Sequence, residues 1–244
     1  MNDILAFDNV FLSFYDLKRE TKVLNDLTFK VKKGKIYTIL GPSGCGKSTI
    51  LNLIAGVINP TSGKIIKPND IGYMFQKDNL FEWLNILDNV LIGLKIKKQL
   101  TLEKIEYAKE LLTKYGLKEF IYNYPHELSG GMRQRVALIR AIIIKPELLL
   151  LDEPFTALDA QTRLEVSDDI FRIIKELKIT TILVTHDVSE AITLSDNILI
   201  LSKRPAKLID NIEVKINDLS PFERRNHNSF KDYFNLIWGE VNGK

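Results

Sequence analysis

Short apolar runs rich in β-branched residues recur along the chain and alternate with longer segments of helical periodicity. The runs lie at residues 36–40, 148–151, 181–184 and 198–201. One of the longer segments places apolar residues every three or four positions, on one face of a helix. These residues are Val166, Ile170, Ile174 and Leu177. Strands that alternate with helices predict an α/β fold whose mostly parallel sheet is covered on both faces.

The stretch from about Asn79 to Pro125 differs, because its pattern is helical and shows no clear strand. One amphipathic pattern within it comprises Leu102, Ile105, Ala108, Leu111 and Leu112. We therefore expect a helical insertion here. The tail after Pro205 is charged and irregular in pattern, and its final piece, DYFNLIWGE, either packs back on the core or contacts a partner.

The composition excludes several classes of protein. A hydrophobic share of 45% and a charged share of 27% are ordinary for a globular chain of 244 residues. The apolar runs fall far short of the roughly 18–20 residues of a membrane-spanning helix, and the first residues lack the pattern of a secretory signal. Cys45 is the only cysteine, which excludes an internal disulfide and suits a reducing cytosol. The net charge of +3 is too small to argue for nucleic acid.

Residues 41–49 read GPSGCGKST and match the phosphate-loop pattern G-x-x-x-x-G-K-[ST]. The loop follows the strand predicted at 36–40 and precedes a helix that a run of apolar positions indicates. These positions are Ile50, Leu51, Ile54 and Val57. Glycines let the backbone wrap tightly and point its N–H groups inward, and the helix adds the positive end of its dipole. This context predicts a site for a nucleotide polyphosphate with magnesium.

Every residue of this loop is a candidate contact to the nucleotide. Lys47 would reach the β- and γ-phosphates, Ser48 would ligate Mg²⁺ and Thr49 would bond a phosphate oxygen. We interpret Cys45 as a small filler rather than a nucleophile, because no base lies near it in the sequence. The candidates are Gly41, Pro42, Ser43, Gly44, Cys45, Gly46, Lys47, Ser48 and Thr49.

Two adjacent carboxylates end an apolar strand in LLLLDEP, residues 148–154. Asp152 can hold Mg²⁺ through water, as the usual partner of a phosphate loop. Glu153 would point in another direction, toward an attacking water, where a carboxylate can act as a general base. Together the two motifs predict an enzyme that hydrolyses a nucleoside triphosphate.

The stretch ELSGGMRQRVALIRA, residues 127–141, distinguishes this chain from other NTPases that have a phosphate loop. With it, the chain resembles the ATP-binding subunit of ABC transporters, whose signature sequence reads LSGGQ; Met132 stands here in place of the glutamine. The resemblance continues in order along nearly the whole chain. It implies an adenine-stacking aromatic at Phe14 or Tyr15, a Q-loop glutamine at Gln76 in GYMFQ, a D-loop over ALD at 157–159, and a switch histidine, His186, in VTHD.

The signature forms a second candidate anion site. Ser129, Gly130 and Gly131 come just before a helical run over 132–144, and helix N-termini attract phosphate. The resemblance implies that two subunits pack head to tail, so that each ATP lies between the phosphate loop of one and the signature of the other. Because the positions that face phosphate are retained, we expect Met132 to leave the activity intact.

The resemblance also assigns roles to three further residues. It implies that His186 contacts the γ-phosphate and steadies the attacking water. Gln76 would contact magnesium and link the state of the γ-phosphate to the partner protein. Asp159, in the D-loop, would contact the opposite subunit.

The implied architecture is that of a P-loop NTPase, an α/β ABC cassette. It would combine a RecA-like, mostly parallel sheet, an antiparallel β portion and a helical subdomain. We expect one ATP-binding domain over residues 1–244, with the helical subdomain at about 79–145 and a short tail at about 205–244.

Among ABC proteins, an importer subunit is the best match, because the chain has one cassette and lacks the long coiled coils of repair ATPases. Several stretches resemble the nitrate/sulfonate/taurine group, among them DNLFEWLNILDNVLIGL and DEPFTALDAQTR. Phe81, Trp83 and Leu84 would line an apolar groove for a permease helix, or belong to the core of the helical subdomain. The alternative function is a soluble ABC ATPase that acts on nucleic acid or ribosomes.

The importer reading implies a set of partners and a location. The partners would be transmembrane permease subunits, a solute-binding protein reached through them, and a second ATPase subunit in a homodimer or a near-identical pair. No nucleic acid is expected. The protein would be peripheral, on the cytoplasmic face of the cell membrane, and its cargo stays open.

Overall fold

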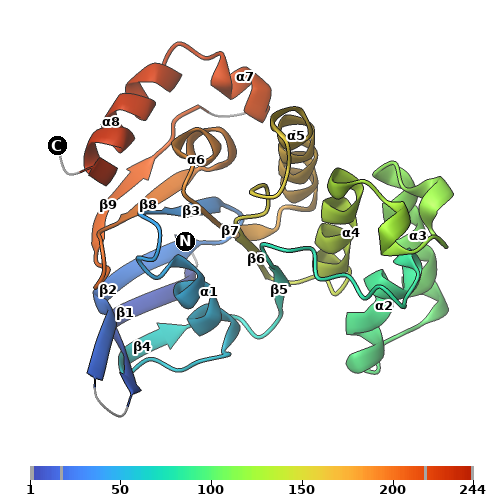
Figure 1. The fold of residues 1–244 in the computed structure, drawn as a ribbon, viewed down its shortest axis with the longest axis horizontal. Helices are drawn as coiled ribbons and strands as arrows, with labels where there is room; N and C mark the ends of the chain where they lie inside the picture. The colour runs from blue at the N-terminus through green and yellow to red at the C-terminus, as the bar shows by residue number, and fades with distance from the viewer. Residues whose placement is uncertain (1–2, 17–18, 217–218, 243–244) are drawn as a thin grey trace.

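The computed structural model describes residues 3–16, 19–216 and 219–242, and a six-stranded sheet forms the centre of this described part (Figure 1). In spatial order its strands are β5 (Ile71–Met74), β6 (Leu148–Asp152), β7 (Thr180–Thr185), β3 (Ile36–Leu40), β8 (Asn197–Leu201) and β9 (Leu208–Glu213). Every neighbouring pair is parallel except β8 with β9. The prediction of a mostly parallel sheet is confirmed, and the strand before the phosphate loop lies inside it.

A three-stranded antiparallel sheet packs beside the central sheet, in the order β2 (Arg19–Lys32), β1 (Asp3–Asp16) and β4 (Ser62–Ile66). Apolar residues alternate along its two long strands, so one face of each is buried. Phe7 and Phe29 face each other there, with ring centroids 4.6 Å apart. This face shares a core cluster with α1 (Lys47–Ala55), the helix after the phosphate loop. The antiparallel portion that the resemblance implied is therefore present.

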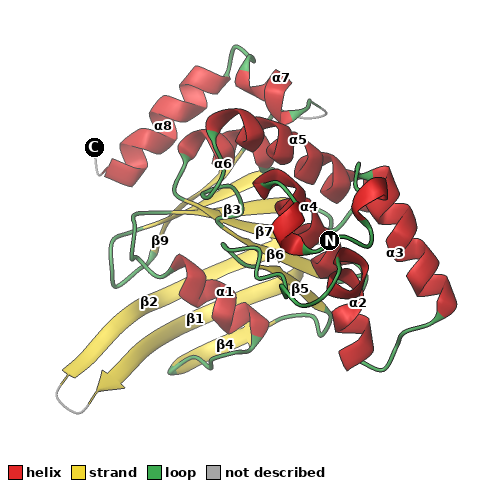
Figure 2. Ribbon diagram, turned by 45° about the vertical axis from the view of Figure 1, so that its right-hand side comes forward, coloured by secondary structure: helices red, strands yellow, loops and turns green. Residues whose placement is uncertain are grey.

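The opposite face of the central sheet is covered by α5 (Ala160–Leu177), α6 (Val188–Leu194), α7 (Pro221–Arg225) and α8 (Phe230–Asn242). Figures 1 and 2 show these helices together on one side of the sheet, with α1 and the antiparallel strands on the other. None of the helices in the described ranges is both long enough and apolar enough to cross a membrane.

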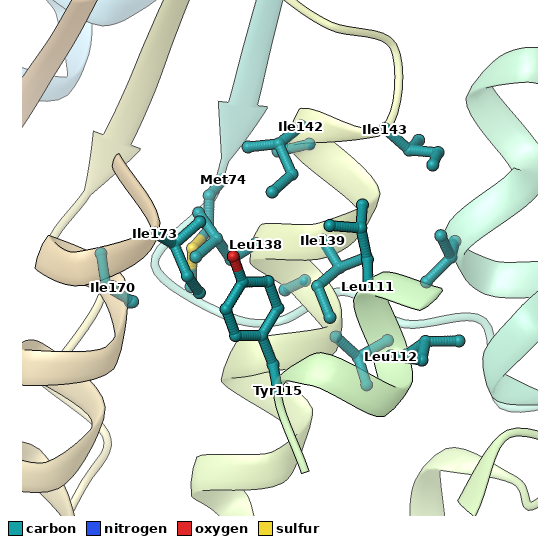
Figure 3. Close-up of a cluster of buried hydrophobic side chains, with 14 of the residues drawn as sticks. Met74, Leu111, Leu112, Tyr115, Leu138, Ile139, Ile142, Ile143, Ile170 and Ile173 are labelled. Atoms are coloured by element: carbon teal, nitrogen blue, oxygen red, sulfur yellow. The ribbon is translucent and has the colours of Figure 1, made fainter. Parts of the chain in front are cut away.

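The segment predicted as helical forms a lobe beside the sheet, made of α2 (Ile86–Ile96), α3 (Leu102–Lys114), two short 3₁₀ helices (Lys118–Phe120 and Pro125–Glu127) and α4 (Gly130–Ile142). Leu111 and Leu112 of α3 pack toward Leu138 and Ile139 of α4 (Figure 3). The same cluster continues to Ile170 of α5. The signature helix α4 therefore joins the lobe to the main body of the protein.

The expectation of an irregular tail is wrong. After Pro205 the chain adds β9 to the central sheet, and residues 230–242 form α8. Ile237 of α8 is fully buried, and its neighbours pack on α6 and β8. The tail therefore packs back on the core, which was one of the two alternatives; residues 217–218 and 243–244 lie outside the described structure. Asp210, Asn211 and Glu213 at the exposed positions of β9 had masked this edge strand.

Three smaller expectations also differ from the structure. The helix after the phosphate loop ends at Ala55, because Gly56 adopts a left-handed conformation that closes it, and Val57 is exposed. Gly130 and Gly131 lie within the first turn of α4 rather than before it. Leu102 and Leu177, predicted on apolar helix faces, are exposed because they sit at helix ends, beyond the reach of the core.

Candidate nucleotide site

Three neighbouring strands of the central sheet bring the predicted catalytic residues to one edge. The phosphate loop follows β3, Asp152 ends β6, and His186 follows β7, which lies between the other two. Because the three strands are parallel, their carboxyl ends meet at the same edge, where ligands of open α/β sheets bind. Residues 34 to 145 positions apart in the sequence thus form one cluster.

The phosphate loop needs its glycines for two different reasons. Gly44 and Gly46 have φ values of 73° and 117°, in the left-handed region that other residues avoid. Gly41 is needed because a larger side chain would not fit. A Cβ at this position would lie 3.1 Å from both Cys45 Sγ and Leu201 Cβ. A Cβ at Gly46 would lie 3.0 Å from a methyl group of Val23, so β2 runs directly against the loop.

Lys47 is the first residue of α1 and is only 6% exposed. Its ammonium group donates to the carbonyl oxygens of Gly41 at 2.9 Å and Pro42 at 3.1 Å. These contacts fold the lysine back over its own loop, at the positive end of the helix. A phosphate would offer this ammonium a charged acceptor in place of two neutral ones.

Cys45 lies on the inner side of the loop and is 1% exposed. Burial raises the pKa of its thiol, an effect that the nearby Lys47 only partly opposes. A neutral, buried thiol is a poor nucleophile. The structure therefore supports the interpretation of Cys45 as a small packing residue.

Asp152 and Ser48 face each other across the loop. The hydroxyl of Ser48 donates to Asp152 Oδ1 at 3.1 Å, and the hydroxyl of Tyr73 lies 3.4 Å from Asp152 Oδ2. Burial raises the pKa of Asp152, as does the neighbouring charge of Glu153, whereas the two hydroxyls and Lys47 lower it. A partly buried carboxylate held by hydroxyl groups is suited to a cation, because a positive ion would offset the cost of its burial.

Glu153 points away from Asp152, as the sequence predicted. Its backbone takes a φ of 44°, unusual for a residue with a side chain, and its N–H donates to the carbonyl of Val184 at 2.9 Å. The carboxylate Oε2 lies 3.3 Å from Nδ1 of His186 and accepts a hydrogen bond from Thr156 at 3.1 Å. Glu153 and His186 thus form a pair at the sheet edge.

Thr185 and Glu190, which the sequence analysis did not single out, hold the turn that carries His186. The Thr185 hydroxyl donates to Glu190 Oε2 at 2.6 Å and accepts the N–H of Asp187 at 3.1 Å. Asp187 in turn caps α6. Glu190 is buried, which raises the pKa of its carboxyl group. The available signal was the hydroxyl just before the histidine and the carboxylate four residues after it in THDVSE.

The signature residues begin α4. Ser129 caps the helix by accepting the N–H of Met132 at 3.3 Å, and Met132 itself packs against the core of the helical lobe. A Cβ on Gly131 would lie 2.8 Å from Cγ2 of Thr162, so this glycine is needed where α4 crosses α5. Nearby, Asp159 caps α5 by accepting the N–H groups of Gln161 and Thr162.

The signature does not join the phosphate loop within this chain. Helix α1 packs in the core cluster shared with the antiparallel sheet, whereas α4 packs with α5 in a separate cluster. Figure 1 shows α4 on the far side of the strands from α1. The structure thus brings Lys47, Ser48, Asp152, Glu153 and His186 together, whereas the signature begins a helix that packs in the other cluster.

Gln76 follows β5 and is exposed at the same sheet edge as Asp152, since β5 and β6 are parallel neighbours. The residues after it are fastened to the signature helix. Arg133 donates from Nε to Asp78 Oδ2 at 3.0 Å, and Arg140 donates to the carbonyl oxygens of Asp78 and Asn79. These two arginines of α4 were not among the predicted site residues, although both lie in the signature stretch.

The two aromatic candidates lie on β1 where it pairs with β2. Phe14 is 47% exposed and Tyr15 is 70% exposed. Side chains alternate along a strand, so Phe14 shares a face with Leu12, which belongs to the core cluster around α1. The opposite face carries Tyr15, whose hydroxyl lies 3.4 Å from Glu20.

Comparison with known proteins gives a consistent result. A family model described as ABC transporter matches residues 24–156. An uncharacterized ABC transporter ATP-binding protein of Bacillus subtilis, YtlC, is 44% identical over 98% of this chain and 95% of its own length. The taurine import ATP-binding protein TauB of Pelagibacter ubique is 42% identical over 85% of this chain and 82% of its own length.

A similar solved structure is a dimeric post-hydrolysis state of the ATP-binding cassette MJ0796, bound to ADP and phosphate. It superimposes with a TM-score of 0.75 at 28% identity, covering 86% of this chain and 99% of the other. The chain therefore belongs to the ABC transporter family and is one of its ATP-binding, ATP-hydrolysing subunits.

Proposed function

We propose that this chain couples ATP hydrolysis to the import of a solute through a membrane permease. The observation that carries the proposal is the cluster at the sheet edge, where phosphate-binding, metal-binding and base groups meet. The similarity of the chain to a taurine import protein supports import as the process to which ATP hydrolysis is coupled. The alternative, an ATPase acting on nucleic acid or ribosomes, lacks comparable support, because the relatives described above are named as transporter proteins.

The phosphates of ATP would lie in the loop of residues 41–49, where backbone N–H groups, Lys47 and the N-terminus of α1 all offer positive charge. For the adenine ring we propose Phe14 rather than Tyr15. Phe14 shares the strand face that packs toward α1, and it pairs with Thr21 of β2, two residues before the strand reaches the loop at Val23. An exposed ring beside the loop can stack on a base.

The donor set around Asp152 fits Mg²⁺. Ser48 and Asp152 offer oxygen atoms 3.1 Å apart, and hard divalent cations prefer oxygen ligands. Gln76, at the same edge, would add an amide oxygen. Bound there with ATP, the ion would neutralise negative charge on the phosphate oxygens.

Hydrolysis would use Glu153 as the general base. A water held by its carboxylate would attack the γ-phosphorus and give up its proton to Glu153, while the bond from the γ-phosphorus to the bridging oxygen breaks. Nδ1 of His186 lies 3.3 Å from the same carboxylate. His186 would orient this carboxylate and contact the γ-phosphate. Thr156 and the Thr185–Glu190 pair keep these two side chains in place.

The second anion site would come from a second subunit. In one chain the phosphate loop and the signature belong to different core clusters, so neither can close on the nucleotide held by the other. A head-to-tail pair would place the signature of one copy over the loop of its partner, with Asp159 at the contact. The dimeric state of the MJ0796 cassette supports this arrangement.

Import also requires permease subunits and, through them, a solute-binding protein, with this chain on the cytoplasmic face of the membrane. Trp83 is the strongest candidate contact, because it is 73% exposed. Its ring lies tilted against that of Phe81, with ring centroids 5.1 Å apart. Phe81 and Leu84 are half-buried and belong to the helical lobe as well. Large exposed aromatics commonly anchor protein interfaces.

The test is capture of partners from gently solubilised membranes, with ATP and magnesium, using tagged Glu153→Gln protein to hold the ATP-bound state. We expect a multi-span permease to be recovered, and Trp83→Ala in the same background to reduce its recovery. Tyr122→Ala, which removes another exposed aromatic of the helical lobe, serves as the control. Recovery of ribosomal or DNA-associated proteins without a permease would overturn the transport role and keep the ATPase chemistry.

A further inference from the structure

Tyr73 contacts the carboxylate of Asp152 through a different oxygen from the one that Ser48 contacts. Its hydroxyl lies 3.4 Å from Asp152 Oδ2, while Ser48 donates to Oδ1 of the same carboxylate. Each oxygen of Asp152 therefore has its own hydroxyl partner, one from α1 and one from β5. Tyr73 lies in the stretch GYMFQ, in which the sequence analysis gave a role to Gln76 alone.

The sheet register explains why these two side chains meet. Tyr73 pairs with Leu150 in the parallel ladder, and Asp152 comes two residues after Leu150, so all three side chains lie on the same face of the sheet. That face packs on α1, whose first turn carries Ser48. The tyrosine is thus delivered to the site by strand pairing rather than by a loop.

The tyrosine ring is fixed and its hydroxyl is a stable donor. The ring stacks on Phe75, with centroids 4.2 Å apart and planes 17° apart, and Phe75 directly precedes Gln76. The phenol hydroxyl donates its hydrogen to Oδ2 of the Asp152 carboxylate.

We propose that Tyr73 is a positioning residue for the magnesium site: it holds Oδ2 of Asp152, so that Oδ1 stays directed at Ser48 and the ion. The inference rests on the magnesium site proposed above. A carboxylate with one fixed oxygen loses less rotational freedom on binding an ion, so the cation binds more tightly. Nucleotide contacts made by Lys47 and the loop backbone do not involve Tyr73.

The test uses Tyr73→Phe, which removes the hydroxyl and keeps the ring stack. ATP binding is measured by calorimetry in a magnesium titration and again in the presence of a chelator. We expect the magnesium concentration for half-maximal ATP binding to rise roughly threefold to tenfold, the usual effect of losing one ordinary hydrogen bond. ATP binding measured with the chelator present should not change. The matched control is Tyr37→Phe, since Tyr37 is a buried tyrosine of β3 whose hydroxyl accepts the N–H of Lys32.

A double mutant separates positioning from a general structural effect. If Tyr73 acts through Asp152, then Tyr73→Phe should change nothing further in an Asp152→Asn background. A magnesium response equal to that of the wild type in Tyr73→Phe, or an equal loss in Tyr37→Phe, would overturn the positioning role and leave the magnesium site standing. Wild-type ATP affinity that does not respond to magnesium would instead overturn the proposed magnesium site.

Discussion

The left-handed backbone of Glu153 shows how a single residue is adapted to its task. A side chain at a φ of 44° costs on the order of 1 kcal/mol, and such costs cluster at functional sites. Here the conformation turns Glu153 away from Asp152, although the two carboxylates are adjacent in the chain. One of them can therefore face Ser48 while the other faces His186.

Replacing Glu153 with Gln should separate binding from hydrolysis. The amide keeps the shape of the side chain and cannot take a proton from water, so we expect kcat to fall by about 10²- to 10⁴-fold with ATP affinity retained. Steady-state phosphate release and equilibrium ATP binding measure the two effects. Glu165→Gln, at an exposed carboxylate of α5, is the control. Turnover at the wild-type rate in Glu153→Gln would show that another group is the base.

Glu190→Gln should stabilise the protein at neutral pH. Burial raises the pKa of Glu190, as does Asp187, against the opposing effects of Thr185, Arg163 and His186. The carboxyl group of Glu190 therefore binds a proton more tightly in the folded state than in the unfolded state. The free energy of unfolding falls as the pH rises from the ordinary pKa of a glutamate through the raised pKa of the folded state. The amide avoids this loss and can still accept from Thr185.

The measurement is urea unfolding of wild type and Glu190→Gln at a series of pH values. The variant should be the more stable at neutral pH. Its advantage should vanish below about pH 4, where Glu190 of the wild type is protonated in both the folded and the unfolded state. A constant difference across the whole range would mean that the carboxylate charge carries no penalty.

Helix α4 connects three functional segments at the scale of secondary-structure elements. Its N-terminus is the signature, its arginines hold the residues after Gln76, and its first turn crosses α5. Gly131 makes that crossing possible, and Asp159 caps α5 close to it. The N-terminal turns of α4 and α5 are therefore in direct contact.

Gly131→Ala should destabilise the protein by about 1–3 kcal/mol, the range seen when a methyl group is forced into a packed contact. The new Cβ would lie 2.8 Å from Thr162 and 3.1 Å from Val166. Gly130→Ala is the matched control, because its Cβ would meet only Leu158, at an ordinary 3.4 Å. Thermal and urea unfolding report both changes.

A second substitution tests whether the contact with Thr162 is the cause. Thr162→Ser removes the methyl group that Gly131→Ala would strike, and it should restore part of the lost stability in the double variant. Equal effects of the two alanine substitutions, with no rescue, would remove the steric explanation for Gly131.

At the scale of the whole molecule, the phosphate loop and the signature lie in different parts of one chain, and the proposed function therefore requires a second copy. Mixing two inactive variants tests this directly. Lys47→Ala lacks a working phosphate loop, and Ser129→Arg blocks the signature. If each site combines the loop of one subunit with the signature of the other, a mixed dimer contains one site built from wild-type parts only.

Each variant alone should be inactive, and an equal mixture should recover about a quarter of the wild-type ATPase rate, because half of randomly formed dimers are mixed and each has one intact site. Phosphate release and ATP-dependent dimer formation by size-exclusion chromatography are the measurements. A mixture as inactive as its components would indicate that the signature serves its own chain.

The sequence predicted the chemistry at the site better than its surroundings. Lys47, Ser48, Asp152, Glu153 and His186 could be found because their motifs fix residue type and spacing locally. Tyr73 could not, because its role depends on strand register. The Thr185–Glu190 pair had a local signal in THDVSE, but its role depends on burial, which the sequence does not show. The tail was misjudged for a related reason: β9 is an edge strand with exposed charges, and only its pairing with β8 makes it a strand.

The sequence by itself determined the family, the nucleotide chemistry and the alternation of strands and helices, because glycine conformations, helix dipoles and apolar periodicity act over a few residues. Only the tertiary structure decided which carboxylate faces the serine, which glycine is required by space, and that the signature lies apart from the phosphate loop. These are contacts between segments far apart in the chain, and they are set by strand order and packing, which no local pattern encodes.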